Sequence, residues 1–295
     1  MREHTMRVAF VGLGSMGAPQ ARLIARNGHE LAVCDAVPAA CDALRAIARV
    51  ASSPADAAKG AEVACVCVRD DEQVIEVVLG GAGLVESLAP GALVLIHSTI
   101  GIDTLYRLQA ALKSRGIALV DAPVSRTRRT DDEAFVFTML GGESGDVDRA
   151  RAVVGAFSTD LDHMGPLGAG MAAKIANNLV TWTHLVVGAQ ATLLAAHYGV
   201  PYEKLRGVLA ANGNLTPTVA TLFDGKHESP PGTDPARDQF LASQAGIGEK
   251  ELQLAIDCGR AANLDVAMIS EARGLVRTMM TQPLALVGSA ATTST

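Results

Sequence analysis

The stretch GPLGAGMAAKIANN, residues 165–178, decides how this chain is organised. It opens a long apolar run, residues 179–198, that contains no proline and only one glycine, Gly188. We expect one helix over residues 169–198, which at 1.5 Å per residue would be about 45 Å long. Much of its circumference is apolar, which predicts a buried helix rather than a merely amphipathic one. Its first turns nevertheless carry Lys174 and Asn178, which are four residues apart and therefore share a face.

A lysine in such a helix needs an explanation, because lysine is rarely fully buried without a partner. In a structural interpretation, the Lys174 stem lies along a domain interface and its amine reaches water. In a functional interpretation, the amine is a reactive group. Spacing alone does not separate the two, so the upstream sequence has to decide.

Upstream, a short strand is expected over residues 7–11, and it runs directly into Gly12-Leu13-Gly14-Ser15-Met16-Gly17. A helix over residues 18–27 and a strand over residues 30–34 follow, and the strand ends at Asp35. This order of strand, G-x-G-x-x-G, helix, strand and acid is a dinucleotide-binding fingerprint. The first glycine permits a tight turn, the second lets a pyrophosphate approach the backbone, and the third lets helix and strand pack closely. The phosphates would bind at the helix N-terminus.

Asp35 decides between the two nicotinamide cofactors. A carboxylate at this position accepts hydrogen bonds from the adenosine ribose hydroxyls and repels a 2′-phosphate. The next residues, Ala36, Val37 and Pro38, offer no arginine that could hold such a phosphate. We therefore predict NAD rather than NADP.

Strands and helices continue to alternate up to residue 164. Further strands are expected over residues 63–68, 93–97, 117–121, 135–140 and 161–164, with helices over 38–48, 54–59, 70–79, 102–115 and 145–157. This predicts an α/β Rossmann domain with a doubly wound, mostly parallel sheet. Ligands of such sheets bind beyond the carboxyl ends of the strands. Val68 and Arg69 lie at the end of one of these strands and Thr99 follows the end of another, so all three are candidate cofactor neighbours.

After Gly165 the strand pattern stops. Helices are expected over residues 201–211, 215–224, 237–245, 249–262 and 266–280. The sequence thus predicts a dinucleotide-binding domain over residues 1–164 and an all-α C-terminal domain over residues 165–295, joined by a long interdomain helix.

Composition excludes several function classes. The chain has 295 residues, 19% of them charged, and its net charge of −6 argues against nucleic acid as the main partner. Polar residues interrupt the long apolar run, so we expect no membrane span. The polar start, residues 1–5, predicts no signal peptide and a cytoplasmic protein. The five cysteines show neither a disulfide framework nor metal-ligand spacing, so we expect buried thiols and no metal.

Four motifs in order resemble the β-hydroxyacid dehydrogenase family, which contains 3-hydroxyisobutyrate dehydrogenase, tartronate semialdehyde reductase and, more distantly, 6-phosphogluconate dehydrogenase. They are the glycine loop of residues 12–17, the sequence DAPVS at residues 121–125, the stretch 165–178, and the sequence KEL at residues 250–252. Together they cover nearly the whole chain at family spacing.

The resemblance implies roles for particular residues. Lys174 would be the general acid/base and Asn178 its orienting partner, Ser125 would contact the substrate carboxylate, and Lys250 would neighbour cofactor or substrate. Oxidising an alcohol needs a base for the hydroxyl proton while hydride passes to the nicotinamide. Because a free lysine has a pKa of about 10.4, we expect burial to lower the pKa of Lys174. A protonated Lys174 can donate directly to a carbonyl, which makes reduction the easier direction at neutral pH.

The chain departs from the family at Arg126 and Thr127, where relatives usually have two glycines. Three interpretations remain open. Arg126 pairs with a substrate anion, such as a second carboxylate, a phosphate or a sulfonate; the loop is remodelled so that the ordinary substrate no longer fits; or the charged loop of residues 126–133 is solvated and pairs with itself. Arg69 also stands where relatives often have proline.

The leading hypothesis is therefore an NAD-dependent dehydrogenase or reductase that acts on a small anionic 3-hydroxy acid or its semialdehyde, with Ser125, Arg126 and Thr127 at the substrate. One alternative is an imine reductase of the same fold, although such enzymes generally lack the lysine. Another is a catalytically silent dinucleotide-binding module. The family resemblance suggests a homodimer or homotetramer.

Overall fold

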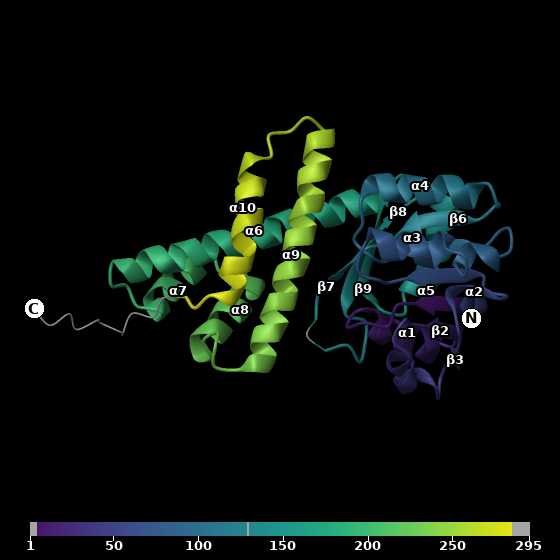
Figure 1. Cartoon of the computed structure of the whole chain (residues 1–295), viewed down its shortest axis with the longest axis horizontal. Coiled ribbons are helices and arrows are strands. Elements are labelled where there is room, and N and C mark those ends of the chain that lie inside the picture. Colours follow the sequence, from purple (N-terminus) through teal and green to yellow (C-terminus); the bar gives the residue numbers. More distant parts are fainter. Residues whose placement is uncertain (1–4, 129, 285–295) are drawn as a thin grey trace, which may run out of the picture. The chain divides into compact units, whose positions relative to one another are not determined.

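The computed structural model describes residues 5–128 and 130–284. It divides into two compact units, residues 1–174 and 175–295. The first unit is built on a nine-stranded sheet of order β3-β2-β1-β4-β5-β6-β8-β7, with β9 paired to β8 (Figure 1). The strands are β1 Arg7–Val11, β2 Glu30–Cys34, β3 Arg49–Val50, β4 Val63–Val66, β5 Leu93–Ile96, β6 Ala118–Asp121, β7 Val124–Arg126, β8 Val136–Gly141 and β9 Ser158–Gly165. The helices are α1 Gly17–Arg26, α2 Pro54–Ala58, α3 Asp71–Leu79, α4 Ile102–Lys113 and α5 Ser144–Val154, with 3₁₀ turns at Pro38–Leu44 and Leu84–Glu86.

Strands β1 to β6 form the parallel part of the sheet, as the alternation predicts. Strands β4 and β5 are buried at every position, which is typical of parallel strands covered by helices on both faces. The last residues of neighbouring strands pair with one another: Val11 with Cys34 and with Val66, Val66 with Ile96, and Ile96 with Asp121. The segments that follow these strands therefore leave the sheet at one edge. Since β1 lies between β2 and β4, this edge includes the point where the strand order reverses, which is where such sheets bind ligands.

Beyond β6 the sheet continues with three strands, β7, β8 and β9, whose arrangement the alternation of strands and helices does not predict. Strand β7 was missed, and β8 runs antiparallel to both β6 and β7 while β9 runs parallel to β8. The three residues of β7 are too few for a periodic pattern. The helix expected over residues 38–48 is instead a shorter 3₁₀ turn.

The second unit is entirely helical in the residues that the structure describes. Helix α6, Ala169–His197, begins in the first unit and continues through the second. The others are α7 Tyr202–Ala211, α8 Pro217–Glu228, α9 Pro235–Ala261 and α10 Ala267–Thr281. Helices α9 and α10 lie side by side, joined by a short loop at the end of α9 (Figure 1).

The prediction of two helices over residues 237–262 is wrong, because α9 is continuous. The gap between the two expected helices contains Gly246 and Gly248. A Cβ atom at Gly248 would lie only 2.7 Å from ring atoms of Trp182 on α6, so this glycine lets two helices approach. Gly188 on α6 faces Phe223 on α8 in the same way. Both glycines are close-packing positions, and neither ends a helix.

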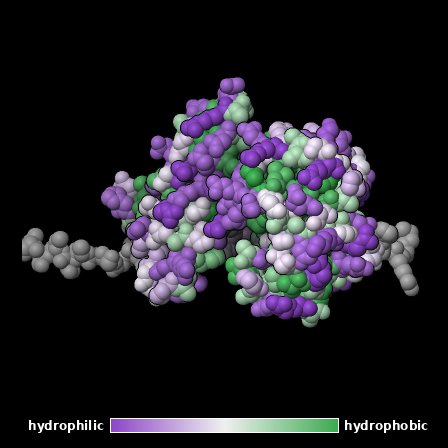
Figure 2. All heavy atoms as spheres, turned by 45° about the vertical axis from the view of Figure 1, so that its right-hand side comes forward, coloured by the Kyte–Doolittle hydropathy of each residue, from purple (hydrophilic) through white to green (hydrophobic). Residues whose placement is uncertain are grey.

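The expectation that α6 is buried all round is also wrong for this chain. Val180, Val187 and Leu194, at intervals of seven residues, are 65%, 62% and 62% exposed. By length and composition α6 could cross a membrane, with 33% of its most apolar window buried. A core helix of a water-soluble protein passes the same test, so this is weak evidence for a membrane. Apolar surface is not confined to one place: Figure 2 shows hydrophobic areas (green) between hydrophilic ones (purple).

Candidate active site

The glycine loop between β1 and α1 has the geometry that a pyrophosphate needs. Gly12 has φ +96°, and a Cβ atom there would overlap the carbonyl oxygen of Cys67. A Cβ atom at Gly17 would overlap the carbonyl of Gly12, whereas a Cβ atom at Gly14 would meet nothing within 4 Å. The first and third glycines therefore let the chain pack against itself, and the second leaves open space at the surface.

The start of α1 suits an anion. No side chain caps its N-terminus, and its first turn contains no acidic residue. The positive end of the helix dipole is thus available to a phosphate. Leu13, Ser15 and Met16 complete the loop in front of it. Asp35, just after β2, accepts hydrogen bonds from the backbone N–H of Leu13 at 2.6 Å and of Val37 at 2.7 Å. These bonds fix its carboxylate beside the loop.

The next two strand ends are tied together. The backbone N–H of Val68 donates to the Ser98 hydroxyl at 2.8 Å, and the N–H of Gly101 donates to Asp71 at 2.9 Å. Thr99 is buried in the same connection, while the side chain of Arg69 is exposed with its Nε 3.9 Å from Asp70. Val68 and Thr99 thus lie at the carboxyl edge that carries the glycine loop, and the Arg69 guanidinium points to solvent.

Lys174 and Ser125 meet, although they are 49 residues apart. The Lys174 amine donates to the Ser125 hydroxyl at 3.0 Å. Both side chains are half-buried, and Ser125 lies in β7, shortly after the carboxyl end of β6. The structure therefore brings a lysine amine to the sheet edge at which parallel α/β sheets bind their ligands.

Asn178 and Lys250 belong to the second unit. Asn178 is buried one turn after Lys174 in α6, and its Nδ2 has no hydrogen-bond partner among the described residues. Lys250 lies within α9. Its neighbour Glu251 accepts a hydrogen bond from the Trp182 indole at 2.8 Å, so the acid of the KEL sequence holds α9 against α6.

Arg126 reaches from β7 to the glycine loop. Its guanidinium carbon lies 4.7 Å from the centroid of the Phe135 ring, a cation–π arrangement. One Nη2 lies 3.5 Å from the carbonyl oxygen of Ser15 and 3.7 Å from the sulfur of Met16. No carboxylate among the described residues pairs with it. Thr127, in contrast, donates its hydroxyl to the Phe135 carbonyl at 3.1 Å, which ties it to the sheet.

The charged loop after β7 pairs only partly with itself. Arg128 and Glu133 form a long contact of 3.5 Å between exposed side chains. Asp131 instead pairs with Arg22 of α1 at 3.1 Å, and Arg26 of α1 reaches the Asp132 carbonyl at 3.4 Å. Arg129 lies outside the described residues. The loop is thus attached to the helix whose N-terminus faces the glycine loop.

Sequence reasoning noted the strand ends at His97 and Asp121 but assigned them no role. His97 packs between Phe10 and Phe157, and its Nδ1 lies 2.8 Å from the Ala122 carbonyl. Burial lowers the pKa of His97 to about 4, so the ring is neutral at pH 7. Asp121 is fully buried, and its carboxylate accepts N–H bonds from the start of α6. A carboxylate at the buried end of a strand was the available signal, since it must find donors.

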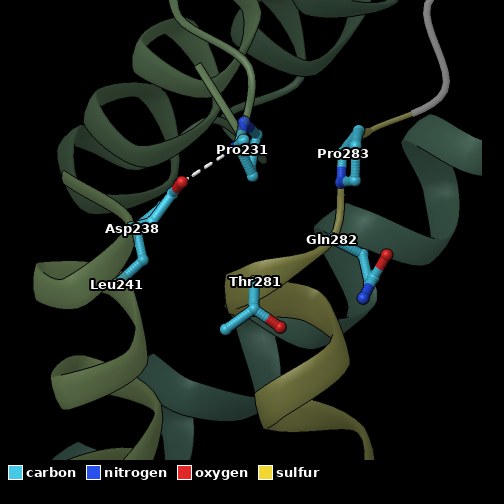
Figure 3. Close-up of a pocket in the computed structure, with 7 residues that line it drawn as sticks. Pro231, Asp238, Leu241, Thr281, Gln282 and Pro283 are labelled. Carbon is cyan, nitrogen blue, oxygen red and sulfur yellow. Dashed lines mark hydrogen bonds between the residues drawn. The ribbon is translucent and has the colours of Figure 1, made fainter. Parts of the chain in front are cut away.

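A pocket of about 450 Å³ lies elsewhere, in the second unit (Figure 3). Pro231, Gly232 and Pro283 line it together with Asp238. Both oxygens of Asp238 accept the backbone N–H of Gly232, at 3.1 and 3.0 Å. This hollow offers no acid/base pair, so we do not assign the reaction to it. Among the described residues, no three histidine, cysteine or acidic side chains are arranged to hold a metal ion.

The fold and the site define a nicotinamide-dependent oxidoreductase. Residues 7–165 match the family model described as the NAD binding domain of 6-phosphogluconate dehydrogenase. The chain belongs to this group, the β-hydroxyacid dehydrogenase family, and is an NAD-dependent enzyme that acts on CH–OH groups of small hydroxy acids.

Known relatives cover most of the chain. An NAD-dependent L-serine dehydrogenase of Pseudomonas aeruginosa is 33% identical over 94% of this chain and 93% of its own length. A 3-sulfolactaldehyde reductase of Escherichia coli is 30% identical over 71% and 72%. A 3-hydroxyisobutyrate dehydrogenase of Mycobacterium tuberculosis, solved with L-serine, superimposes with a TM-score of 0.78 at 27% identity, covering 96% of both chains. Solved imine reductases also have this fold at lower identity, which shows the fold alone.

Proposed function

We propose that Lys174 is the general acid/base of this enzyme and that Ser125 and Arg126 hold the anionic part of a small 3-hydroxy acid or its semialdehyde. The observation that carries the proposal is the 3.0 Å hydrogen bond between the Lys174 amine and the Ser125 hydroxyl. It supports a lysine held at the edge where the glycine loop also lies. Asn178, one turn further along α6, would orient the amine.

The reaction consists of one hydride transfer and one proton transfer. The nicotinamide ring of NAD supplies the hydride acceptor or donor. In oxidation, a neutral Lys174 amine takes the hydroxyl proton; in reduction, the ammonium form gives a proton to the carbonyl oxygen. Ser125 can donate its hydroxyl hydrogen to the substrate while it accepts from Lys174, because a hydroxyl both donates and accepts. The residues thus move one proton at one oxygen of the substrate.

The position of Arg126 supports a substrate that carries an anionic group. Its guanidinium is exposed and held over the Phe135 ring, beside Ser15 of the glycine loop. Arginine binds carboxylates and sulfonates through paired N–H groups. The E. coli relative acts on a sulfonated aldehyde. We therefore place an anionic group of the substrate, carboxylate or sulfonate, on Arg126. The role of Thr127 in the same segment stays a prediction.

The first experiment follows NADH absorbance with L-serine, 3-hydroxyisobutyrate, glycerate and 3-sulfolactaldehyde, with NAD and NADP in parallel. Lys174→Ala should lower kcat by roughly 10²- to 10⁴-fold, as expected for loss of an acid/base group. NAD binding, measured by fluorescence titration, should be kept. Lys113→Ala removes an exposed lysine and is the matched control. Unchanged turnover in Lys174→Ala would contradict the proposed role.

Arg126→Gly restores the residue usual in the family. If Arg126 binds a substrate anion, this variant should raise KM for the preferred substrate by roughly 10- to 150-fold, which corresponds to a loss of about 1.5–3 kcal/mol in binding. Its effect on the NAD affinity should be much smaller. Equal loss for every substrate, together with weaker NAD binding, would assign Arg126 to the cofactor instead. Lys250→Ala in the same assays tests the predicted role of that residue.

The substrate panel distinguishes this proposal from the two alternative functions. An imine reductase would reduce a cyclic imine and would not turn over any hydroxy acid. A silent module would bind NAD without turnover of any compound in the panel. Lys174, held by its bond to Ser125, argues against the imine reductase, because such enzymes generally lack this lysine.

The same proposal includes a homodimer or homotetramer in the cytoplasm. The exposed stripe of Val180, Val187 and Leu194 on α6 is a face that a second copy could bury. Val187→Lys should therefore lower the mass measured by light scattering, whereas Val37→Lys, at an exposed valine of the first unit, should not. Burial raises the pKa of the thiols of Cys65 and Cys67, to about 12 for Cys67, which keeps both thiols protonated at neutral pH.

A further inference from the structure

The first turn of α6 is held by a side chain from a distant strand. Asp121 is the last residue of β6 and is fully buried. Its Oδ1 accepts the backbone N–H of Gly168 at 2.8 Å, and its Oδ2 accepts that of Met171 at 2.6 Å. The N-terminal N–H groups of a helix usually bond to a nearby side chain or to water. Here a buried carboxylate takes that place.

Two glycines make room for this carboxylate. A Cβ atom at Gly141, on β8, would overlap Oδ1 of Asp121. A Cβ atom at Gly170 would overlap the Met139 carbonyl and lie 2.9 Å from Oδ2 of Asp121. The glycines of residues 141 and 170 are thus required by close approach to Asp121. Three separate segments of the first unit, β6, β8 and the start of α6, therefore form this contact together.

The same segment that carries Asp121 also receives the Lys174 amine. Met171, bonded to Asp121, precedes Lys174 by one helical turn. Ser125, which accepts from the Lys174 amine, follows Asp121 in the next strand. One short stretch, residues 121–125, therefore fixes the helix backbone below the lysine and the end of its side chain.

We propose that Asp121 is a positioning residue for Lys174: its carboxylate fixes the start of α6 and thereby the place of the lysine amine at the sheet edge. Asp121 acts through the helix and does not touch the substrate. Its effect on turnover rests on the proposed role of Lys174, but its effect on the position and reactivity of the amine does not.

The ionised carboxylate of Asp121 offers an acceptor oxygen to each of the two N–H groups. Both oxygens face N–H donors, and the positive helix end stabilises a negative charge. An asparagine would offer one oxygen and turn an NH₂ group towards the other N–H. Asp121→Asn therefore removes one bond while changing the side-chain volume little. Burial raises the pKa of Asp121 to about 6, although the N–H groups of Gly168 and Met171 act in the opposite direction.

The test measures the helix start and the lysine separately in Asp121→Asn. Backbone hydrogen exchange over residues 168–174 should become roughly 10- to 100-fold faster, which is the loss of one hydrogen bond to a charged group. Exchange over residues 7–34 should not change. Acetylation of Lys174 by acetic anhydride, read by mass spectrometry against Lys113, should become several-fold faster because the amine is no longer held at Ser125.

Asp71→Asn is the matched control. It removes a carboxylate that accepts the N–H of Gly101 at the start of α4, at the same sheet edge. It should leave both exchange over residues 168–174 and Lys174 acetylation unchanged. With a substrate in hand, Asp121→Asn should lower kcat with the NAD affinity kept.

Unchanged exchange at residues 168–174 would overturn the proposal, and so would faster exchange with unchanged Lys174 acetylation. Full turnover in Lys174→Ala would instead refute the proposed function and leave these two readouts valid. If Asp121→Asn does not fold, exchange in the unmodified chain is compared at pH 7.5 and 5.0, where protonation removes one acceptor. Titratable side chains bond to residues beside this contact: His163 at the Gly165 carbonyl, Tyr106 at the Leu167 carbonyl, and His97 at the carbonyl of Ala122, next to Asp121. Lys174 follows in the next turn of α6, and the comparison is repeated in His163→Gln. Protonation of Asp121 at pH 5.0 is checked by the carbon chemical shift of its carboxyl group, and equal protection with the carboxyl protonated, after correction for intrinsic rates, would then count against the proposal.

Discussion

Two helix N-termini at the same sheet edge are used in opposite ways. The start of α1 has no capping side chain and no acid in its first turn, and it faces the open space at Gly14. The start of α6 is filled by the buried carboxylate of Asp121. Both ends carry the same partial positive charge. The difference teaches that such an end becomes a ligand site only where the protein itself leaves it open; where an internal anion occupies it, the helix is instead held in position.

The largest expected effect is at the open end. Gly12→Ala would place a methyl group against the Cys67 carbonyl in a backbone conformation of φ +96°. Strain and overpacking together should cost roughly 3–5 kcal/mol. We expect NAD binding to be lost in a fluorescence titration and the melting temperature to fall. Normal NAD affinity in this variant would contradict the loop geometry.

At the start of α6, the buried Asp121 should make the unfolding free energy depend on pH. The folded-state pKa of Asp121 is raised from 3.8 to about 6, so the folded chain holds the extra proton between these values. The stability that this extra proton contributes is fully present below pH 3.8 and is lost as the pH rises through about 6. The unfolding free energy of the parent chain minus that of Asp121→Asn should therefore increase on acidification from pH 7 to 4, by up to about 3 kcal/mol. Denaturant titrations of both chains at four pH values measure this difference, and a flat difference would show that Asp121 titrates normally.

A milder change separates ligand space from protein packing at the open end. A methyl group at Gly14 meets nothing within 4 Å in the protein, so Gly14→Ala should change stability by less than about 0.5 kcal/mol. It should nevertheless weaken NAD binding by roughly tenfold, the cost of crowding by one methyl group. Calorimetric titration and thermal melting test the two parts. Unaltered affinity would mean that the pyrophosphate does not approach this residue.

The smallest effect concerns the charged loop on α1. Arg22→Gln breaks a half-exposed ion pair with Asp131 and should cost roughly 0.2–1 kcal/mol. Because the loop also carries Arg126, the same variant should alter KM for an anionic substrate two- to threefold at most. Arg128→Gln, in a more exposed pair with Glu133, is the control and should have no measurable effect. A larger effect of Arg128→Gln than of Arg22→Gln would mean that Arg128, and not Arg22, holds the charged loop in place.

Much of the fold was predictable because its signals are local. The glycine loop, Asp35 and the alternation of buried strands with helices predicted the parallel sheet and its cofactor, and the apolar run after Lys174 predicted α6. The antiparallel strand β7 was missed because a three-residue strand is defined by its partners, not by a period. The gap expected in α9 contains Gly248, and the sequence alone does not show why a glycine stands there, because its packing partner, Trp182, lies 66 positions away in the chain (248 − 182).

The sequence by itself determined the kind of protein: a Rossmann domain for NAD followed by helices, with a lysine at the start of the longest one. The reason is that turn chemistry and burial period act over a few residues and are written in their order. Only the tertiary structure decided that Asp121 fills the start of α6, that Ser125 receives the Lys174 amine, and that Arg126 lies beside Ser15. These contacts join residues far apart in the chain, and no local pattern records which distant donor a buried acceptor will meet.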